Sequence, residues 1–255
     1  MPTRLAWADA TPARRLPTRR RGQRTEIGSR AEGGAGMRRW LRDNGLAVAM
    51  FAAFAVFLLL QSVFGWQTHN EELTEFGADP IGWPAYLASG HFAEAVFENW
   101  ESEFLQMGGY VLLTAYLVQR GSAESKPEGQ TDRPEDDERR ATPESPWPVR
   151  VGGLPLVVYR NSLSLALLLI FAGSFVGHLL GGTAAYNAEQ ALESGAPPIS
   201  AWQFLGTSDF WFQSMQNWQS EFLAVGTLIV LSIVLRQHAS PESKPVTVPH
   251  AQTGS

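Results

Sequence analysis

The stretch NWESEFL at residues 99–105 stands at the entrance to an apolar run, and nearly the same stretch, NWQSEFL, returns at residues 217–223. The same shift of 118 residues places SAESKP (122–127) on SPESKP (240–245). A long motif that recurs at one fixed spacing indicates an internal repeat. The chain therefore reads as two related halves, and whatever this motif does, it does twice.

Four apolar segments surround the two motifs. Residues 46–64 and 163–180 carry no charge over 19 and 18 positions, while residues 104–118 and 222–235 are shorter. Starting the shorter segments at Trp100 and Trp218, inside the motif, extends them to 19 and 18 residues. A helix needs about 20 predominantly apolar residues to cross a bilayer. We expect an all-α membrane protein with four transmembrane helices, arranged as two duplicated helical hairpins with amphipathic helices in the outer loops. The first segment is longer than the apolar region of a signal peptide.

The positive charges predict the orientation in the membrane. All 20 Lys and Arg residues fall in three blocks, at residues 4–42, 120–160 and 236–244, whereas loops 65–99 and 181–217 carry only acidic charges. Because Lys and Arg stay on the cytoplasmic side, both termini and the central linker are expected inside a bacterial cytoplasmic membrane, in a multi-pass arrangement. Both hairpins then run in the same sense, related by a pseudo-twofold axis along the membrane normal. The chain has no Cys, which excludes disulfides and thiolate ligands.

The chain divides into five predicted regions. Residues 37–120 and 160–238 form the two repeats, each with two spans, and residues 121–159 form a charged cytoplasmic linker that is largely disordered because it has little apolar surface to bury. Residues 239–255 are expected to be a disordered tail. Residues 1–36 read as a disordered basic extension or a misassigned start, the alternative being a basic arm that binds anionic lipid headgroups.

The doubled NWxSEFL motif, the two SxESKP endings and NSLSLALLLIF at residues 161–171 resemble a family of bacterial integral membrane proteins described only as a domain of unknown function. The resemblance covers roughly residue 37 to residue 249. It implies an integral membrane protein, and it implies no activity, ligand or catalytic residue.

The helical positions in the motif single out one carboxylate in each half. At about 100° per residue, Phe92, Val96, Trp100 and Phe104 form an apolar face, and Glu103 falls within it. A second set of residues shares the opposite, polar face: His91, Glu94, Glu98, Glu101 and Ser102. Glu221 takes the place of Glu103 in the second half. Glu103 and Glu221 are therefore the candidate functional pair, each expected on the apolar face of its helix.

Two interpretations of this pair stay open. In the structural one, Glu103 and Glu221 lie at helix N-termini, where the helix dipole favours negative charge, and Asn99 and Asn217 cap or bond locally. In the functional one, the two carboxylates meet near the pseudo-twofold axis and share a proton or bind a cation. The residues expected to support the pair are Asn99, Trp100, Ser102, Asn217, Trp218 and Ser220.

The first functional hypothesis is a structural or interaction protein of the cytoplasmic membrane, and the alternative is a small ion or proton conductor or transporter that uses Glu103 and Glu221. The polar set His91, Glu94 and Glu98 reads as a solvated face more readily than as a metal site, and His178 reads as a hydrogen-bonded polar residue. No catalytic residue, cofactor or metal site is predicted, and the protein is not expected to be an enzyme. Its expected partners are the lipid bilayer and either a second copy of the chain or another membrane protein, with no nucleic acid.

Overall fold

The computed structural model describes residues 36–127 and 136–254, and every regular element among these residues is a helix. The chain forms two compact units, residues 1–60 and 61–255, each described by itself. Helix α2 (Gly45–Glu75) runs through the boundary between them. In the first unit, the described residues 36–60 are almost entirely helical. The predicted extension 1–36 lies, apart from Gly36, outside the described residues.

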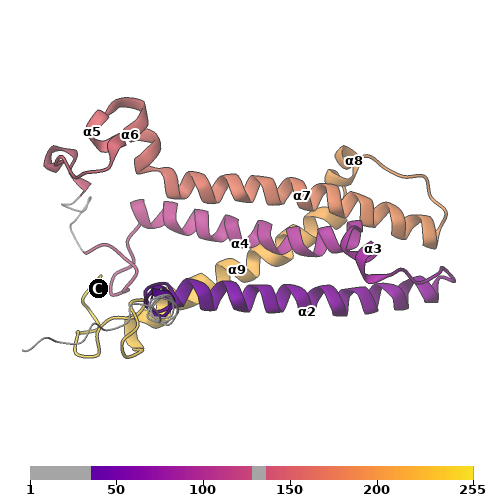
Figure 1. Ribbon diagram of the computed structural model, residues 1–255, viewed down its shortest axis with the longest axis horizontal. Helices are drawn as coiled ribbons and strands as arrows, with labels where there is room; N and C mark the ends of the chain where they lie inside the picture. The colour runs from indigo at the N-terminus through magenta and orange to yellow at the C-terminus, as the bar shows by residue number, and fades with distance from the viewer. Residues whose placement is uncertain (1–35, 128–135, 255) are drawn as a thin grey trace, which may run out of the picture. The chain divides into compact units, whose positions relative to one another are not determined.

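After α2, the second unit contains three long helices. Two of them have the same length, and the third is close to α2 in length. Helices α4 (Gly90–Tyr116) and α9 (Ser208–Val234) both have 27 residues, and α7 (Ser162–Glu193) has 32 against 31 for α2. The short helices, placed in Figure 1, are α3 (Trp83–Leu87), η2 (Glu138–Arg140), α5 (Trp147–Val151), α6 (Gly153–Arg160) and α8 (Ala201–Leu205).

Among the described residues, three helices, and not the four expected, are apolar and long enough to cross a membrane by length and composition. They are α2, α7 and α9. Helix α4 is long enough, but it carries Glu94, Glu98, Glu101 and Glu103 in its first half. Its charge-free part after Glu103 is short, because the helix ends at Tyr116 and residue 117 is already extended. The physical reason for the difference is therefore the polarity of α4 and not its length.

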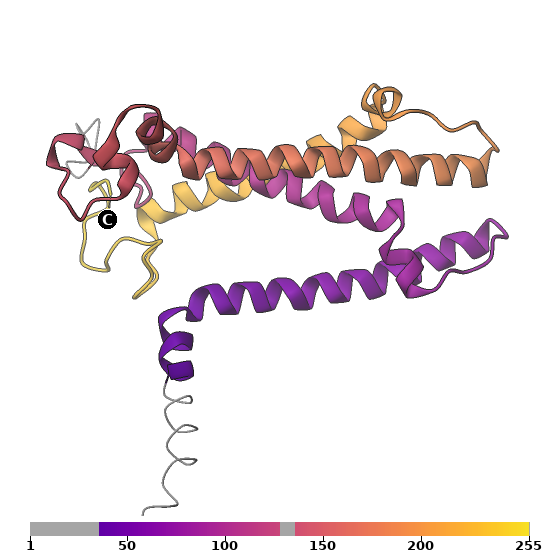
Figure 2. The ribbon, with the colours of Figure 1, turned by 45° about the horizontal axis from the view of Figure 1, so that its top comes forward.

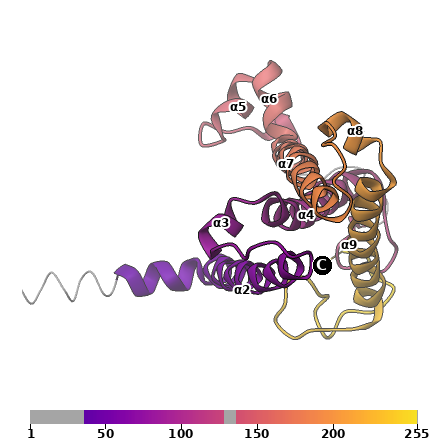
Figure 3. The same cartoon turned by 90° about the vertical axis from the view of Figure 1, so that its right-hand side faces the viewer.

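Helix α4 packs against α7 along much of its length and contacts α9 as well. Figures 1 and 2 show α4 and α7 running side by side, and Figure 3 shows them with α9 from the end. Small residues make this approach possible. A Cβ atom at Gly181 would lie 2.7 Å from the backbone nitrogen of Glu94, and one at Gly177 would lie 2.6 Å from the Phe97 ring. Gly173, Gly177 and Gly181 form a GxxxGxxxG pattern on α7, which is typical of close helix contacts in membranes.

The connection between α2 and α3 and the connection between α7 and α8 use the same hydrogen bonds. The side chain of Asn70 bonds both backbone groups of Ile81, accepting from its nitrogen at 2.8 Å and donating to its oxygen at 3.0 Å. Asn187 bonds Ile199 in the same way, at 2.8 and 2.9 Å. Each connection then reaches a short helix (α3 or α8) and turns into a long one, as Figure 2 shows for the loop between α7 and α9.

The chain after α9 is held by one buried lysine. The ammonium of Lys244 is fully buried and donates to the backbone oxygens of Gly121, His250 and Gln252 at 2.6, 2.8 and 3.1 Å. Burial, and then the charge of Arg236, lower the pKa of Lys244. The bond to Gly121 joins residues 239–254 to the start of the linker, and the disorder expected of this tail stays a prediction. The described part of the linker contains η2, α5 and most of α6.

Replacing Gly181 with Leu is expected to destabilise the fold, because the new side chain would meet backbone atoms of α4 that cannot move aside. Overpacking of this kind costs about 1–3 kcal/mol. Gly173→Leu on the same helix is the control, since a Cβ atom there has nothing within 4 Å. Thermal unfolding of the purified protein in detergent measures both, and equal loss of stability in the two variants would contradict the assigned packing.

Candidate functional site

A cluster of polar side chains lies among α4, α7 and α9, and is called the central polar cluster below. Each of the three helices contributes residues that hydrogen-bond across the helix interfaces. Its members are Glu94, Glu98 and Glu101 from α4, His178 from α7, and Gln213, Asn217 and Trp218 from α9.

Glu101 is the innermost carboxylate of this cluster, with an exposed fraction of 0%. Its Oε2 lies 2.8 Å from Nδ1 of His178, which is equally buried. Its Oε1 accepts a hydrogen bond of 2.8 Å from the indole nitrogen of Trp218. Both oxygens of a buried carboxylate are therefore bonded, as an ion inside a protein requires.

The hydrogen bonds of Gln213 indicate the protonation state of His178. The amide nitrogen of Gln213 donates to Oε1 of Glu94 at 3.0 Å, which leaves the Gln213 oxygen to face Nε2 of His178 at 3.1 Å. His178 thus lies between two oxygen acceptors, one from Gln213 and one from Glu101. Both acceptors are satisfied when the imidazole carries two protons, since a charged histidine donates from both nitrogens. The geometry fits an imidazolium paired with the Glu101 carboxylate.

Phe210 completes the surroundings of His178 on α9. Its ring stacks on the imidazole with centroids 4.7 Å apart and an interplanar angle of 25°. Phe210 is itself fully buried. An aromatic face over a cation is a favourable arrangement, so α9 supplies both a polar and an aromatic contact to the same histidine.

The structure reverses the predicted orientation of the motif. Glu101, expected on the polar face, is buried, whereas Glu103, which the functional interpretation directs into the bundle, is exposed. Glu103 and Glu221 lie near enough for their charges to repel each other, but neither belongs to the central polar cluster. Whether the pair has a function stays a prediction.

The capping part of the structural interpretation was wrong. Helix α4 begins after Ser89 and α9 begins after Thr207, and these residues cap the helices by accepting from the backbone nitrogens of Phe92 and Phe210. Asn99 and Asn217 lie well inside the helices, as Glu103 and Glu221 also do.

Some of the residues expected to support the pair form hydrogen bonds within their own helix, and others belong to the central polar cluster. Ser102 and Ser220 each donate to the backbone oxygen three residues earlier, at 2.8 and 2.9 Å. Asn99 donates to the backbone oxygen of Ala95, while Asn217 also donates to Glu98. Trp100 lies edge-on to Phe97, with ring centroids 5.6 Å apart. The bonds of Asn99 and Ser102 in the first copy are therefore local, whereas Asn217 and Trp218 in the second copy reach α4.

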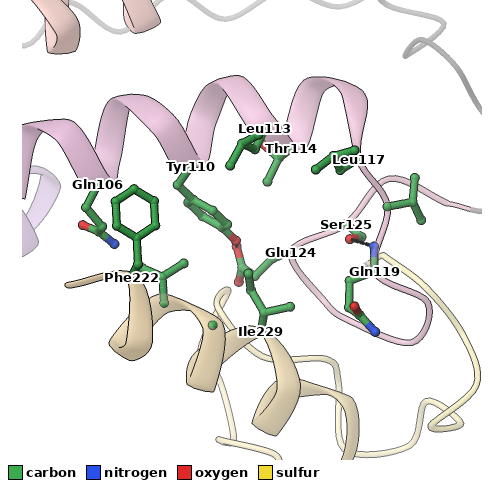
Figure 4. A pocket seen from close by; sticks show the side chains of 13 residues that line it. Gln106, Tyr110, Leu113, Thr114, Leu117, Gln119, Glu124, Ser125, Phe222 and Ile229 are labelled. Carbon is green, nitrogen blue, oxygen red and sulfur yellow. Dashed lines mark hydrogen bonds between the residues drawn. The ribbon is translucent and has the colours of Figure 1, made fainter. Parts of the chain in front are cut away.

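An apolar cavity of about 320 Å³ lies between α4 and α9, beyond the central polar cluster. Figure 4 shows Gln106 and Phe222 at one side of it and the Tyr110 side chain directed toward Glu124. The hydroxyl of Tyr110 donates to Glu124 at 3.3 Å. Burial, and then the charge of Glu242, raise the pKa of Glu124. The two SxESKP segments therefore bring their glutamates together, which the repeat alone did not predict.

The fold and the cluster define a class of protein: an all-helical chain with membrane-compatible helices and buried polar side chains between them. Residues 37–255 match the sequence family described as a domain of unknown function, DUF6766, and the chain belongs to that family. No curated protein and no solved structure matches the chain.

Replacing Glu101 with Ala is expected to destabilise the protein by about 3–5 kcal/mol, because it leaves His178 and Trp218 buried without their partner. Glu103→Ala, two residues along the same helix, removes an exposed carboxylate and is expected to change stability by no more than about 0.5 kcal/mol. Thermal or denaturant unfolding in detergent measures the difference. A greater loss for Glu103→Ala would show that the motif faces the other way.

Proposed function

We propose that the chain is an integral protein of the bacterial cytoplasmic membrane with four spans, and that its role is structural: it forms a rigid helical scaffold that binds lipid and membrane partners. The observation that carries the proposal is the complete burial of Glu101 and His178 between helices whose outer surfaces are apolar. Side chains of α4 and α7 that are exposed include Met107, Leu112, Leu165 and Leu169. An apolar outside around a polar inside suits a lipid environment.

Helix α4 is proposed as the fourth span despite its glutamates. Glu94, Glu98 and Glu101 bond to residues of α7 and α9, so their polarity is turned away from the surrounding solvent or lipid. A hydropathy average counts these residues as if they faced lipid. Ionisable residues in membrane helices almost always face the bundle interior and pair there, and these three glutamates of α4 are paired in this way.

A duplication of one hairpin explains the recurrence of local structure. Helices α4 and α9 have equal lengths and equivalent caps, at Ser89 and Thr207. The SxESKP segments also share a turn, in which Ser125 and Ser243 accept from the backbone nitrogens of Gln119 and Gln237 at 2.8 and 2.9 Å. The distribution of Lys and Arg favours both termini and the linker on the cytoplasmic side.

A structural role fits the central polar cluster better than a conducting role. The polar side-chain atoms of His178 and Glu101 are hydrogen-bonded within a network that joins three helices. Such a network favours one register of packing between the helices. A proton or ion path needs groups that can exchange partners along a route. The proposed partners are the bilayer and, on the exposed apolar faces, a second copy of the chain or another membrane protein.

The alternative function is an ion or proton conductor that uses Glu103 and Glu221. Its support is the proximity of the two carboxylates. The exposure of Glu103 argues against it, because an exposed carboxylate outside the cluster lines no enclosed path.

Flux through proteoliposomes distinguishes the two functions. The scaffold proposal predicts that proton and cation flux with the purified protein equals that of empty vesicles, at any pH between about 5 and 8. The control is the double variant Glu103→Gln/Glu221→Gln, reconstituted at the same density. Flux above the empty-vesicle level that disappears in the double variant would overturn the scaffold proposal and establish the conductor.

A further inference from the structure

A second group of ionisable side chains lies at the outer end of the same unit, away from the central polar cluster. It contains His69 and Glu72 near the end of α2 and His91 in the first turn of α4. One ligand atom from each of these three side chains lies within 4.8 Å of the other two. The imidazole rings are 4.8 Å apart between centroids. Residues 69 and 72 are three positions apart and therefore neighbours on one helix face.

One atom of this group is buried without a hydrogen bond. Nδ1 of His69 has no hydrogen-bond partner, and Oε2 of Glu72 lies 3.6 Å from it, beyond normal hydrogen-bond length. A buried polar atom with no partner is costly and calls for an explanation. A ligand between His69 and Glu72 would supply the missing partner.

Tyr86 from α3 supports His91 from the other side. Its side chain is almost completely buried, and its hydroxyl lies 3.2 Å from Nδ1 of His91. Gly65, one turn before His69 on α2, makes room for it, because a Cβ atom there would overlap the hydroxyl. The tyrosine thus fixes the orientation of the His91 ring, as residues outside the ligand set do in metal sites.

The second half of the chain lacks both histidines. At the positions equivalent to His69, Tyr86 and His91 it has Tyr186, Phe204 and Asp209, while Glu189 takes the place of Glu72. The two halves share the Asn70/Asn187 loop bonds that frame this region. The histidines are therefore not needed to build the connection, and the second half provides matched control positions.

We propose that His69, Glu72 and His91 bind a divalent transition-metal ion, with Zn²⁺ as the best-fitting ion. Two imidazoles and one carboxylate are the ligand set of open zinc sites, where a water or another group takes the fourth position. Zinc bonds of about 2.0–2.2 Å need ligand atoms closer together than 4.8 Å. The Glu72 side chain is half exposed and free to close that gap.

The three side chains lie outside the proposed spans. His91 lies before Trp100, where the proposed span of α4 begins, so the site is placed in the outer connection and not in the membrane.

Zinc binding to the full-length protein in detergent tests the proposal. The parent is expected to bind one Zn²⁺ per chain, measured by competition with a chromogenic chelator after metal removal. Glu72→Gln and His91→Ala are each expected to weaken binding at least tenfold, and Tyr86→Phe by about 10–100-fold. The matched controls Glu189→Gln and Asp209→Ala are expected to keep the parent affinity.

Co²⁺ gives a second readout that does not depend on a stability change. The parent is expected to show a visible d–d absorption band that is lost in Glu72→Gln, a variant that keeps the shape of an exposed side chain. If His91→Ala fails to fold, the comparison of metal binding between Glu72→Gln and Glu189→Gln tests the proposal. Absence of Zn²⁺ binding in the parent, equal affinity in that pair, or loss of binding only when His238 and His250 are replaced by Ala would overturn the proposal.

Discussion

The pairing of Glu101 with His178 is the interaction on which the rest of the bundle depends. A carboxylate and an imidazole with no exposed surface are stable only if each polar atom has a partner. His178 and Trp218 hydrogen-bond to the two oxygens of Glu101, and the side-chain oxygen of Gln213 hydrogen-bonds to the second nitrogen of His178. These bonds fix the rotation of α4, α7 and α9 at one level, because a shift of any helix would leave a buried charge unpaired.

Close packing on both sides of this pair follows from the same requirement. Gly177 lies directly before His178 and Gly181 lies three residues after it, both against α4, and they bring the two backbones near enough for the imidazole to reach Glu101. With Glu94, Glu98 and Glu101 bonded inside, α4 presents its apolar residues Met107, Leu112 and Leu113 outward. The polar interior and the apolar exterior are thus two results of one arrangement, and this arrangement supports the proposed role as a rigid scaffold.

The sequence predicted the elements better than their orientation. Apolar runs and the repeated motif located the long helices, and α4 and α9 indeed end at equivalent residues. The prediction that Glu101 and Glu103 lie on different faces of α4 was correct. The functional interpretation, however, turned the apolar face toward the bundle interior, as in a soluble protein. Around a membrane helix the polar face is the one to bury. The GxxxGxxxG pattern around His178 was the available signal, whereas the partners of His178 come from other helices and have no local pattern. The contact of Lys244 with Gly121 is equally long-range.

The passage of α4 through the membrane, with Glu94, Glu98 and Glu101 inside the bundle, is the central claim, and chemical labelling of single cysteines tests it most directly. The chain has no Cys, so Asp79→Cys, Glu144→Cys and Glu193→Cys can each be made in the full-length protein. All three positions are exposed. A membrane-impermeant maleimide added to intact cells is expected to label residues 79 and 193, and residue 144 only after the cells are opened. Labelling of residues 79 and 144 from the same side would contradict the claim, since α4 would then not cross.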